Sequence, residues 1–282
     1  MGRAPRTESE TGIYHVMNRG ISRQTIFFND GDKAEFERRL SIMHDRLGVS
    51  VYAYSLMGNH YHLLLHSPPG ALSEGMHLIA APFARNANER QGRDGPLFRG
   101  RFHALAVETD AYLLTASRYI HLNPLDLGLD PRADRWSSYG VYIGRRCCPD
   151  FLDVDPLLAM FGGIRQQLVD FTEGPTNVFD SHPIGSSDVR LLIEAAIGLQ
   201  DIDGMLPDET HRSLHRTLAL LLLDQRMPAT AIAAVRELVG PVSADALRLA
   251  RQRARQRMTQ YPELSAVLAR VIVALPDRAT AA

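Results

Sequence analysis

The sequence predicts an α+β fold in which an antiparallel sheet with a pair of helices is followed by an all-α region. Stretches rich in β-branched and aromatic residues alternate with stretches of helical spacing, in the order strand, helix, strand, strand, helix, strand, helix. Beyond about residue 187 only helical spacing recurs. This order of strands and helices before residue 187 is that of a split βαβ, or ferredoxin-like, arrangement, in which the helices cover one face of the sheet.

The first elements have clear boundaries. Residues 12–18 form an apolar and aromatic run that predicts a strand. A helix is expected from Asn29, whose side chain can cap it, to Gly48. Residues 49–56 and 61–65 then predict the two strands of a hairpin, because Gly58-Asn59 between them is a turn signal.

A second helix and a fourth strand complete the sheet domain. The helix is expected at residues 71–89, with a kink or interruption at Pro82. The strand is expected near residues 102–107. Asp110 then caps a helix that runs to Asn123, because the proline after it cannot continue a helix.

Charge is distributed unevenly along the 282 residues. The net charge of −1 divides into +3 for residues 1–146, −10 for residues 147–210 and +6 for residues 211–282. This division predicts two modules joined by a connector. The modules are a sheet domain at 1–172 and a helical domain at 187–282 that could contain a helix-turn-helix, and the connector is an acidic linker at 173–186. A neutral total therefore does not argue against a nucleic-acid partner.

Two histidines, His60 and His62, stand two apart on the second hairpin strand. Side chains at i and i+2 project from one face of a strand, so both imidazoles can address one target. They are either metal ligands or general acid/base groups, or else polar positions on a half-exposed strand. If they hold a cation, two protein nitrogens leave coordination positions open for phosphate oxygens and water, which suits a catalytic Mg²⁺ or Mn²⁺.

Several spaced motifs extend this pattern. The segment Gly58-Asn59-His60-Tyr61-His62-Leu63-Leu64-Leu65 resembles the paired-histidine strand of the HUH endonucleases. With it come Tyr14 to Gly20, Phe98 to Phe102, Arg118 to Pro124 and Trp136 to Tyr139, and together they resemble the REP-associated tyrosine transposases. The resemblance ends near residue 163 and covers somewhat over half of the chain.

The resemblance implies a single tyrosine nucleophile, and Tyr119 is the candidate, with Tyr112 as the runner-up on the same helix face. Asn123 lies four residues after Tyr119, so it could supply a third metal ligand beside His60 and His62. The alternative is an asparagine that only ends the helix. His121 projects from another side of the helix and is expected to be structural or to line the DNA path.

Arginines are the expected DNA contacts. Those near the sheet are Arg19, Arg23, Arg99, Arg101 and Arg118, and those on the basic C-terminal helix are Arg251 and Arg255. The alternative is that they are solvated surface charges. His103 stands where the family usually has lysine, which could weaken contact with phosphate.

With this resemblance, the sequence predicts a metal-dependent single-strand DNA nuclease and strand transferase that acts through a 5′-phosphotyrosine intermediate. The resemblance implies that its substrate is hairpin-forming, palindromic DNA. Two alternatives stay open: a phosphodiesterase that uses activated water, and a DNA-binding protein that has lost catalysis. The N-terminus lacks the apolar run of a signal peptide and no long apolar stretch occurs, so a cytoplasmic location without membrane contact is expected. The sequence does not indicate the oligomeric state.

Overall fold

The structure is a computed structural model that describes residues 8–174, 211–223 and 229–260, with single positions at 189, 190, 193, 264, 267, 268 and 271. The chain divides into two compact units, one formed by Met1–Glu108 with Asn123–Leu168 and the other by Thr109–Leu122 with Val169–Ala282. Most of the expected linker, and most of the helical region expected after residue 187 up to residue 210 and beyond residue 260, lie outside the described residues. The predicted domain boundaries stay predictions.

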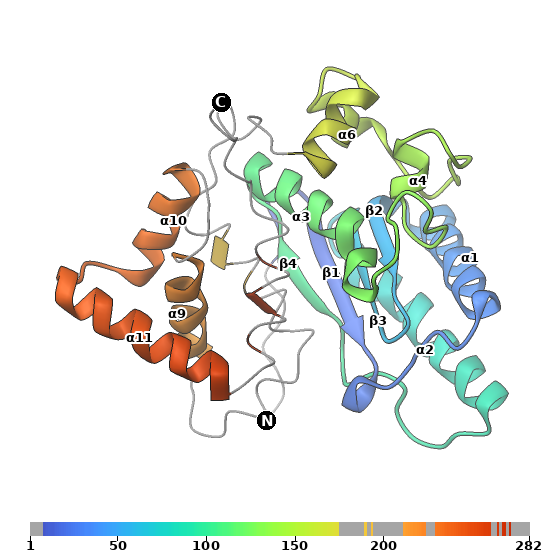
Figure 1. The fold of residues 1–282 in the computed structure, drawn as a ribbon. Helices are drawn as coiled ribbons and strands as arrows, with labels where there is room; N and C mark the ends of the chain where they lie inside the picture. The colour runs from blue at the N-terminus through green and yellow to red at the C-terminus, as the bar shows by residue number, and fades with distance from the viewer. Residues whose placement is uncertain are drawn as a thin grey trace. The chain divides into compact units, whose positions relative to one another are not determined.

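The first unit contains a four-stranded sheet (Figure 1). Its strands are β1 (Ile13–Arg19), β2 (Ser50–Leu56), β3 (His60–His66) and β4 (His103–Ala106). The spatial order is β2-β3-β1-β4 and every neighbouring pair is antiparallel. This is the ferredoxin-like order, so the predicted α+β class is confirmed.

Two helices, α1 (Asp30–Leu47) and α2 (Ala71–Gln91), pack against each other. Helix α1 begins with a capping box in which Asn29 and Asp32 bond each other's backbone, and it ends at Gly48 in the left-handed region, as predicted. Apolar residues of both helices form one core with alternate residues of the strands. Its members include Phe36, Phe83, Val16, Tyr61 and Leu63.

Two local predictions need correction. The helix α2 is not interrupted at Pro82, which lies inside it, and the alternative of a kink there stays a prediction. Proline removes one backbone hydrogen bond, but the buried apolar face of α2 on both sides of Pro82 keeps the helix packed on the core. The other correction concerns the cap of α3 (Asp110–Leu122): the hydroxyl of Thr109, not Asp110, accepts from the backbone N–H of Tyr112 at 3.1 Å.

The register of the sheet separates two faces. Val16 pairs with Leu63 and both point into the core, whereas Met17 pairs with His62 and Arg19 with His60. His60 and His62 therefore share the face opposite to the α1–α2 core. The turn Gly58-Asn59 holds the hairpin close, since the Met57 N–H donates to the His60 carbonyl at 2.9 Å.

Residues after Asn123 return to the sheet. They include η2 (Asn123–Leu127), α4 (Tyr139–Tyr142) and α5 (Asp155–Ala159). The N–H of Leu56 donates to the Trp136 carbonyl at 2.9 Å, and the N–H of Val51 donates to the Phe151 carbonyl at 2.9 Å. These segments pair with the outer edge of β2.

The second unit is helical in its described part. It contains α3, the end of α6 (Arg165–Glu173), α9 (His211–Leu222), α10 (Ala229–Val239) and α11 (Ala244–Gln260). Both α10 and α11 pack against α9, and the short turn between α10 and α11 contains Gly240 at a φ of 80°. Among the described residues, no helix has the length and apolar character needed to cross a bilayer.

Candidate active site

His60 is the first residue of β3, directly after the hairpin turn, and is 5% exposed. Its Nδ1 atom lies 2.7 Å from the Oδ1 atom of Asn59, and its Nε2 atom lies 3.1 Å from the Oδ1 atom of Asn123. Asn123 is 3% exposed. The structure therefore brings together two of the three expected metal ligands from positions 63 residues apart in the sequence.

The two contacts of His60 have a chemical consequence. A neutral imidazole carries one N–H, yet both ring nitrogens face amide oxygens. The shorter contact favours donation from Nδ1 to Asn59, which leaves the Nε2 lone pair directed toward Asn123 Oδ1. Two lone pairs 3.1 Å apart repel each other unless Nε2 also carries a proton, the Asn123 amide rotates or one cation binds both atoms. The two atoms are close enough together to be ligands of one cation.

His62 is fully buried and is oriented by a third histidine. Its Nδ1 atom lies 2.9 Å from the Nε2 atom of His15 on β1, and the two ring centroids are 5.1 Å apart. Burial lowers the pKa of His15 to about 3, so this imidazole is neutral at pH 7. If His62 Nδ1 donates to His15 Nε2, the His62 Nε2 atom presents its lone pair, as a metal ligand requires.

The donor set fits a divalent metal. The rings of His60 and His62 are nearly perpendicular, with centroids 5.4 Å apart, and the Asn123 amide adjoins the first of them. No cluster of three or more histidine, cysteine, aspartate or glutamate side chains that could hold a metal occurs within the described residues. A site built from His60, His62 and Asn123 therefore relies on two imidazoles and an amide, with phosphate oxygens or water completing the coordination.

Tyr119 lies on the last turn of α3 and is 2% exposed. It precedes Asn123 by four residues along the chain. Tyr112 on the same helix is fully buried, and His121 is 1% exposed, where burial lowers its pKa to about 3. The burial of His121 agrees with a structural role, while the roles of both tyrosines stay predictions.

Backbone groups of Arg19, Arg23 and Arg99 lie close to the turn that precedes His60 or to the strand next to it. The N–H of Arg99 donates to the Arg19 carbonyl at 3.0 Å, and the Asn59 amide donates to the Arg23 carbonyl at 3.2 Å. Arg99 and Arg101 are exposed, Arg23 is half-buried and Arg19 is 3% exposed. These bonds gather three motifs that are distant in the sequence around the turn that precedes His60.

The remaining arginines differ in exposure. Arg118 is buried, with its Nη2 atom donating to the Gly174 carbonyl at 3.2 Å and its guanidinium 5.8 Å from the Phe171 ring. Arg251 is half-buried and donates to the Leu223 carbonyl at 3.5 Å, while Arg255 is exposed. The described contacts of Arg118 and Arg251 are within the protein, and their contact with DNA stays a prediction.

His15 is the residue that the sequence analysis missed. The signal was its position four residues before Arg19 on the first strand, inside one of the recognised motifs. Its contact with His62 depends on the pairing of β1 with β3, in which His15 is opposite Leu64 and Met17 is opposite His62. A diagonal contact across two strands requires the register to be known.

The sheet order and the paired buried histidines on β3 agree with the HUH-type fold that the resemblance implied. Residues 9–123 match the family model "Transposase IS200 like". The matched segment is less than half of the chain, and it agrees with the resemblance to REP-associated tyrosine transposases. The match shows similarity to transposases through this segment.

Solved structures show more distant likenesses. One is a REP-associated tyrosine transposase bound to a REP hairpin, 15% identical, which covers 55% of this chain and 93% of that chain with a TM-score of 0.43. Another is a transposase-like protein of Deinococcus radiodurans, 18% identical, which covers 38% of this chain and 87% of that chain with a TM-score of 0.30. None of the curated proteins matches the sequence.

Proposed function

We propose that this protein is a metal-dependent endonuclease and strand transferase that acts on single-stranded, hairpin-forming DNA through a covalent tyrosine intermediate. The observation that carries the proposal is the arrangement of the donors. His60 Nε2 and Asn123 Oδ1 lie 3.1 Å apart, while Asn59 and His15 contact the opposite ring nitrogens of His60 and His62. Such outer contacts fix the tautomer that a metal-binding histidine needs.

The chemistry assigned to Tyr119 balances as a transesterification. Its Oη atom forms a bond to the phosphorus while the bond from phosphorus to the 3′ oxygen breaks. The phenol loses its proton to a base, and the departing 3′ oxygen takes up a proton, giving a 5′-phosphotyrosine and a free 3′-OH. Because an ester replaces an ester, another 3′-OH can reverse the step and join two strands.

The side chains have distinct roles in this proposal. A Mg²⁺ or Mn²⁺ ion held by His60, His62 and Asn123 would neutralise charge on the scissile phosphate. Asn59 and His15 orient the two imidazoles. Arg23 and Arg99, whose backbone lies near the His60 turn, and Arg101, two residues after Arg99, bind phosphates that flank the scissile bond.

The experiment that tests the proposal looks for the covalent intermediate. End-labelled hairpin DNA with single-stranded flanks is incubated with the protein and Mn²⁺ or Mg²⁺, then run on a denaturing gel with and without protease. We expect a protease-sensitive band of reduced mobility. Tyr119→Phe should abolish it, and Tyr112→Phe, the matched tyrosine on the same helix, should retain it.

The other outcomes discriminate the rival functions. Cleavage that survives in Tyr119→Phe, with no adduct, would identify a phosphodiesterase that uses activated water. Tight binding with no cleavage in either metal, across a panel of palindromic substrates, would identify a DNA-binding protein without catalysis. Either result would overturn the proposed mechanism.

A further inference from the structure

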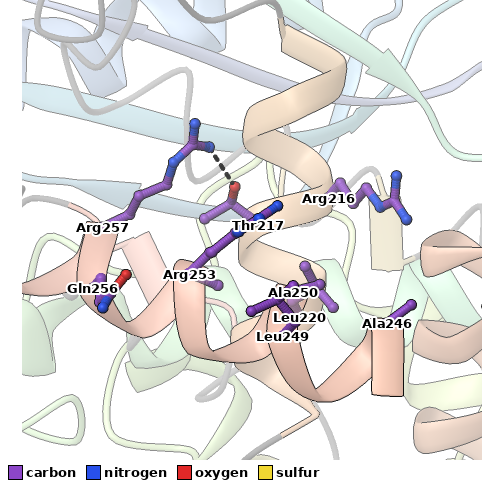
Figure 2. Close-up of a pocket in the computed structure, with 10 residues that line it drawn as sticks. Arg216, Thr217, Leu220, Ala246, Leu249, Ala250, Arg253, Gln256 and Arg257 are labelled. Atoms are coloured by element: carbon purple, nitrogen blue, oxygen red, sulfur yellow. Dashed lines mark hydrogen bonds between the residues drawn. The ribbon is translucent and has the colours of Figure 1, made fainter. Parts of the chain in front are cut away.

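A groove lies between α9 and α11 in the second unit (Figure 2). It has a volume of about 580 Å³ and is open to one side. Leucine and alanine side chains of the two helices form its apolar lining. Its polar lining consists of Arg216 and Thr217 from α9 and of Arg253, Gln256 and Arg257 from α11.

The groove is strongly basic. Of the described residues that line it, three are arginine and none is acidic. Arg216 and Arg253 are exposed, so their guanidinium groups can reach a ligand without rearrangement of the helices. Arg257 is half-buried, and its Nη1 atom donates to the Thr217 hydroxyl at 3.1 Å, which joins the two helices across the groove.

We propose that the α9–α11 groove binds the phosphate backbone of the DNA substrate. Guanidinium groups from two helices around one concavity can contact successive phosphates, and Arg216 and Arg253 are exposed on either side of it. The described residues of the lining include arginine, threonine, glutamine, leucine and alanine and no aromatic side chain on which a base could stack. We therefore assign the contact to the backbone, independent of base sequence.

The arginines that line the groove are not Arg251 and Arg255, the two that the sequence analysis singled out on this helix. Arg253 and Arg255 are two residues apart on α11, which separates them by about 200° around the helix axis. Arg253 lines the groove and Arg255 does not. Arg255 is exposed as well, so the two residues form a matched pair that differs in position but not in chemistry.

This inference rests on the proposed function for the choice of DNA as the ligand, but the two can fail separately. Binding to the groove needs neither a metal nor Tyr119. It is measured with the full chain in EDTA, where no cleavage occurs. A catalytically silent protein that bound DNA through the groove would overturn the proposed function and leave this inference standing.

The test is a salt titration of affinity for a fluorescent hairpin with single-stranded flanks. The slope of log affinity against log salt changes by roughly 0.7 per phosphate contact on a single strand and 0.9 on a duplex. The double variant Arg216→Gln/Arg253→Gln should flatten the slope by about 1.4–1.8. Arg255→Gln should leave it unchanged, and Arg216→Lys/Arg253→Lys should keep most of it because the charge remains.

Hydrogen exchange measured on the unmodified protein tests the same contact without any substitution that could alter the fold. The hairpin should slow exchange in peptides of α9 and α11 that line the groove, and a scrambled hairpin of equal length should slow it equally. An unchanged slope in the double glutamine variant, or protection confined to other segments, would overturn the inference. A slope that Arg255→Gln reduces and the double variant does not would show that DNA contacts α11 at Arg255, outside the groove.

Discussion

His15 and His62 contact each other through ring nitrogens inside the sheet, with Nε2 of His15 2.9 Å from Nδ1 of His62. Both side chains are fully buried. His15 is neutral at pH 7 because burial lowers its pKa to about 3, so it can accept a hydrogen bond through a lone pair. The contact can therefore select which nitrogen of His62 is available to a metal before any metal arrives.

Replacing His15 should weaken metal binding without removing a ligand. His15→Leu removes the acceptor, and we expect Mn²⁺ affinity to fall roughly 10- to 100-fold, as for other outer partners of metal-binding histidines. His15→Gln can still accept through its side-chain oxygen and should recover part of the loss. Calorimetric titration with Mn²⁺ measures the affinity, and nitrogen chemical shifts of His62 in the metal-free protein report its tautomer. Equal affinity and an unchanged tautomer in His15→Leu would show that His15 only fills space.

The two histidines of β3 should be required for cleavage and not for most of the DNA affinity. His60→Ala and His62→Ala should each abolish metal-dependent cleavage, while hairpin affinity in EDTA falls less than about threefold because arginines supply the phosphate contacts. His66→Ala is the matched control, since His66 ends the same strand and is only half-buried. Far-UV circular dichroism verifies the fold. If either alanine variant unfolds, the histidines are structural and the central assignment fails.

Variants of Asn123 distinguish its two possible roles, as a metal ligand or as a residue that only ends a helix. Asn123→Ala removes the oxygen that lies 3.1 Å from His60, and Mn²⁺ affinity should fall about tenfold. Asn123→Asp places a charged oxygen at the same position and should bind Mn²⁺ at least as tightly as the unchanged protein. Both affinities are measured by calorimetry in the absence of DNA. Unchanged affinity in both variants would mean that Asn123 has no part in the site.

Local sequence predicted the sheet because its strands are runs of β-branched, aromatic and aliphatic residues and because turn and helix-stop signals separate the elements. His60 and His62 could be assigned to one face because that conclusion needs only the two-residue repeat of a strand. The His15 contact and the gathering of Arg19, Arg23 and Arg99 around His60 could not be predicted. They depend on how β1 pairs with β3 and on where the loop before β4 returns, which are long-range properties.

The helix α2 shows a different limit. Pro82 indicates a break when local rules alone are applied, but packing of the residues around it outweighs one lost hydrogen bond. The groove between α9 and α11 could not be predicted from the sequence either. The predicted arginine helix exists as α11, yet only the packing against α9 shows which of its arginines share a concavity.

The hydrogen bonds of the Glu35 carboxylate between α1 and α2 should make the first unit less stable at acid pH. Glu35 accepts hydrogen bonds from Arg39 at 2.7 Å, from Asn86 at 2.7 Å and from Arg90 at 2.7 Å. Burial acts to raise the pKa of Glu35, but these donors outweigh it and hold the pKa below the ordinary value of 4.5. A folded pKa below the unfolded one contributes stability above pH 4.5 that is lost as the pH falls through the folded value.

Glu35→Gln should therefore reduce stability at pH 7 and remove part of its pH dependence. We expect a loss of about 1–3 kcal/mol at pH 7, because charged hydrogen bonds become neutral ones. The difference between the two proteins should shrink below pH 4.5, by at most about 1.4 kcal/mol per pH unit. Urea unfolding can be followed by fluorescence of Trp136, the one tryptophan, whose Nε1 atom donates to Asp30 on α1 at 2.8 Å. Glu74→Gln, at an exposed position of α2, should change neither quantity, and a constant difference between pH 7 and pH 3 would refute the assignment of this pH dependence to Glu35.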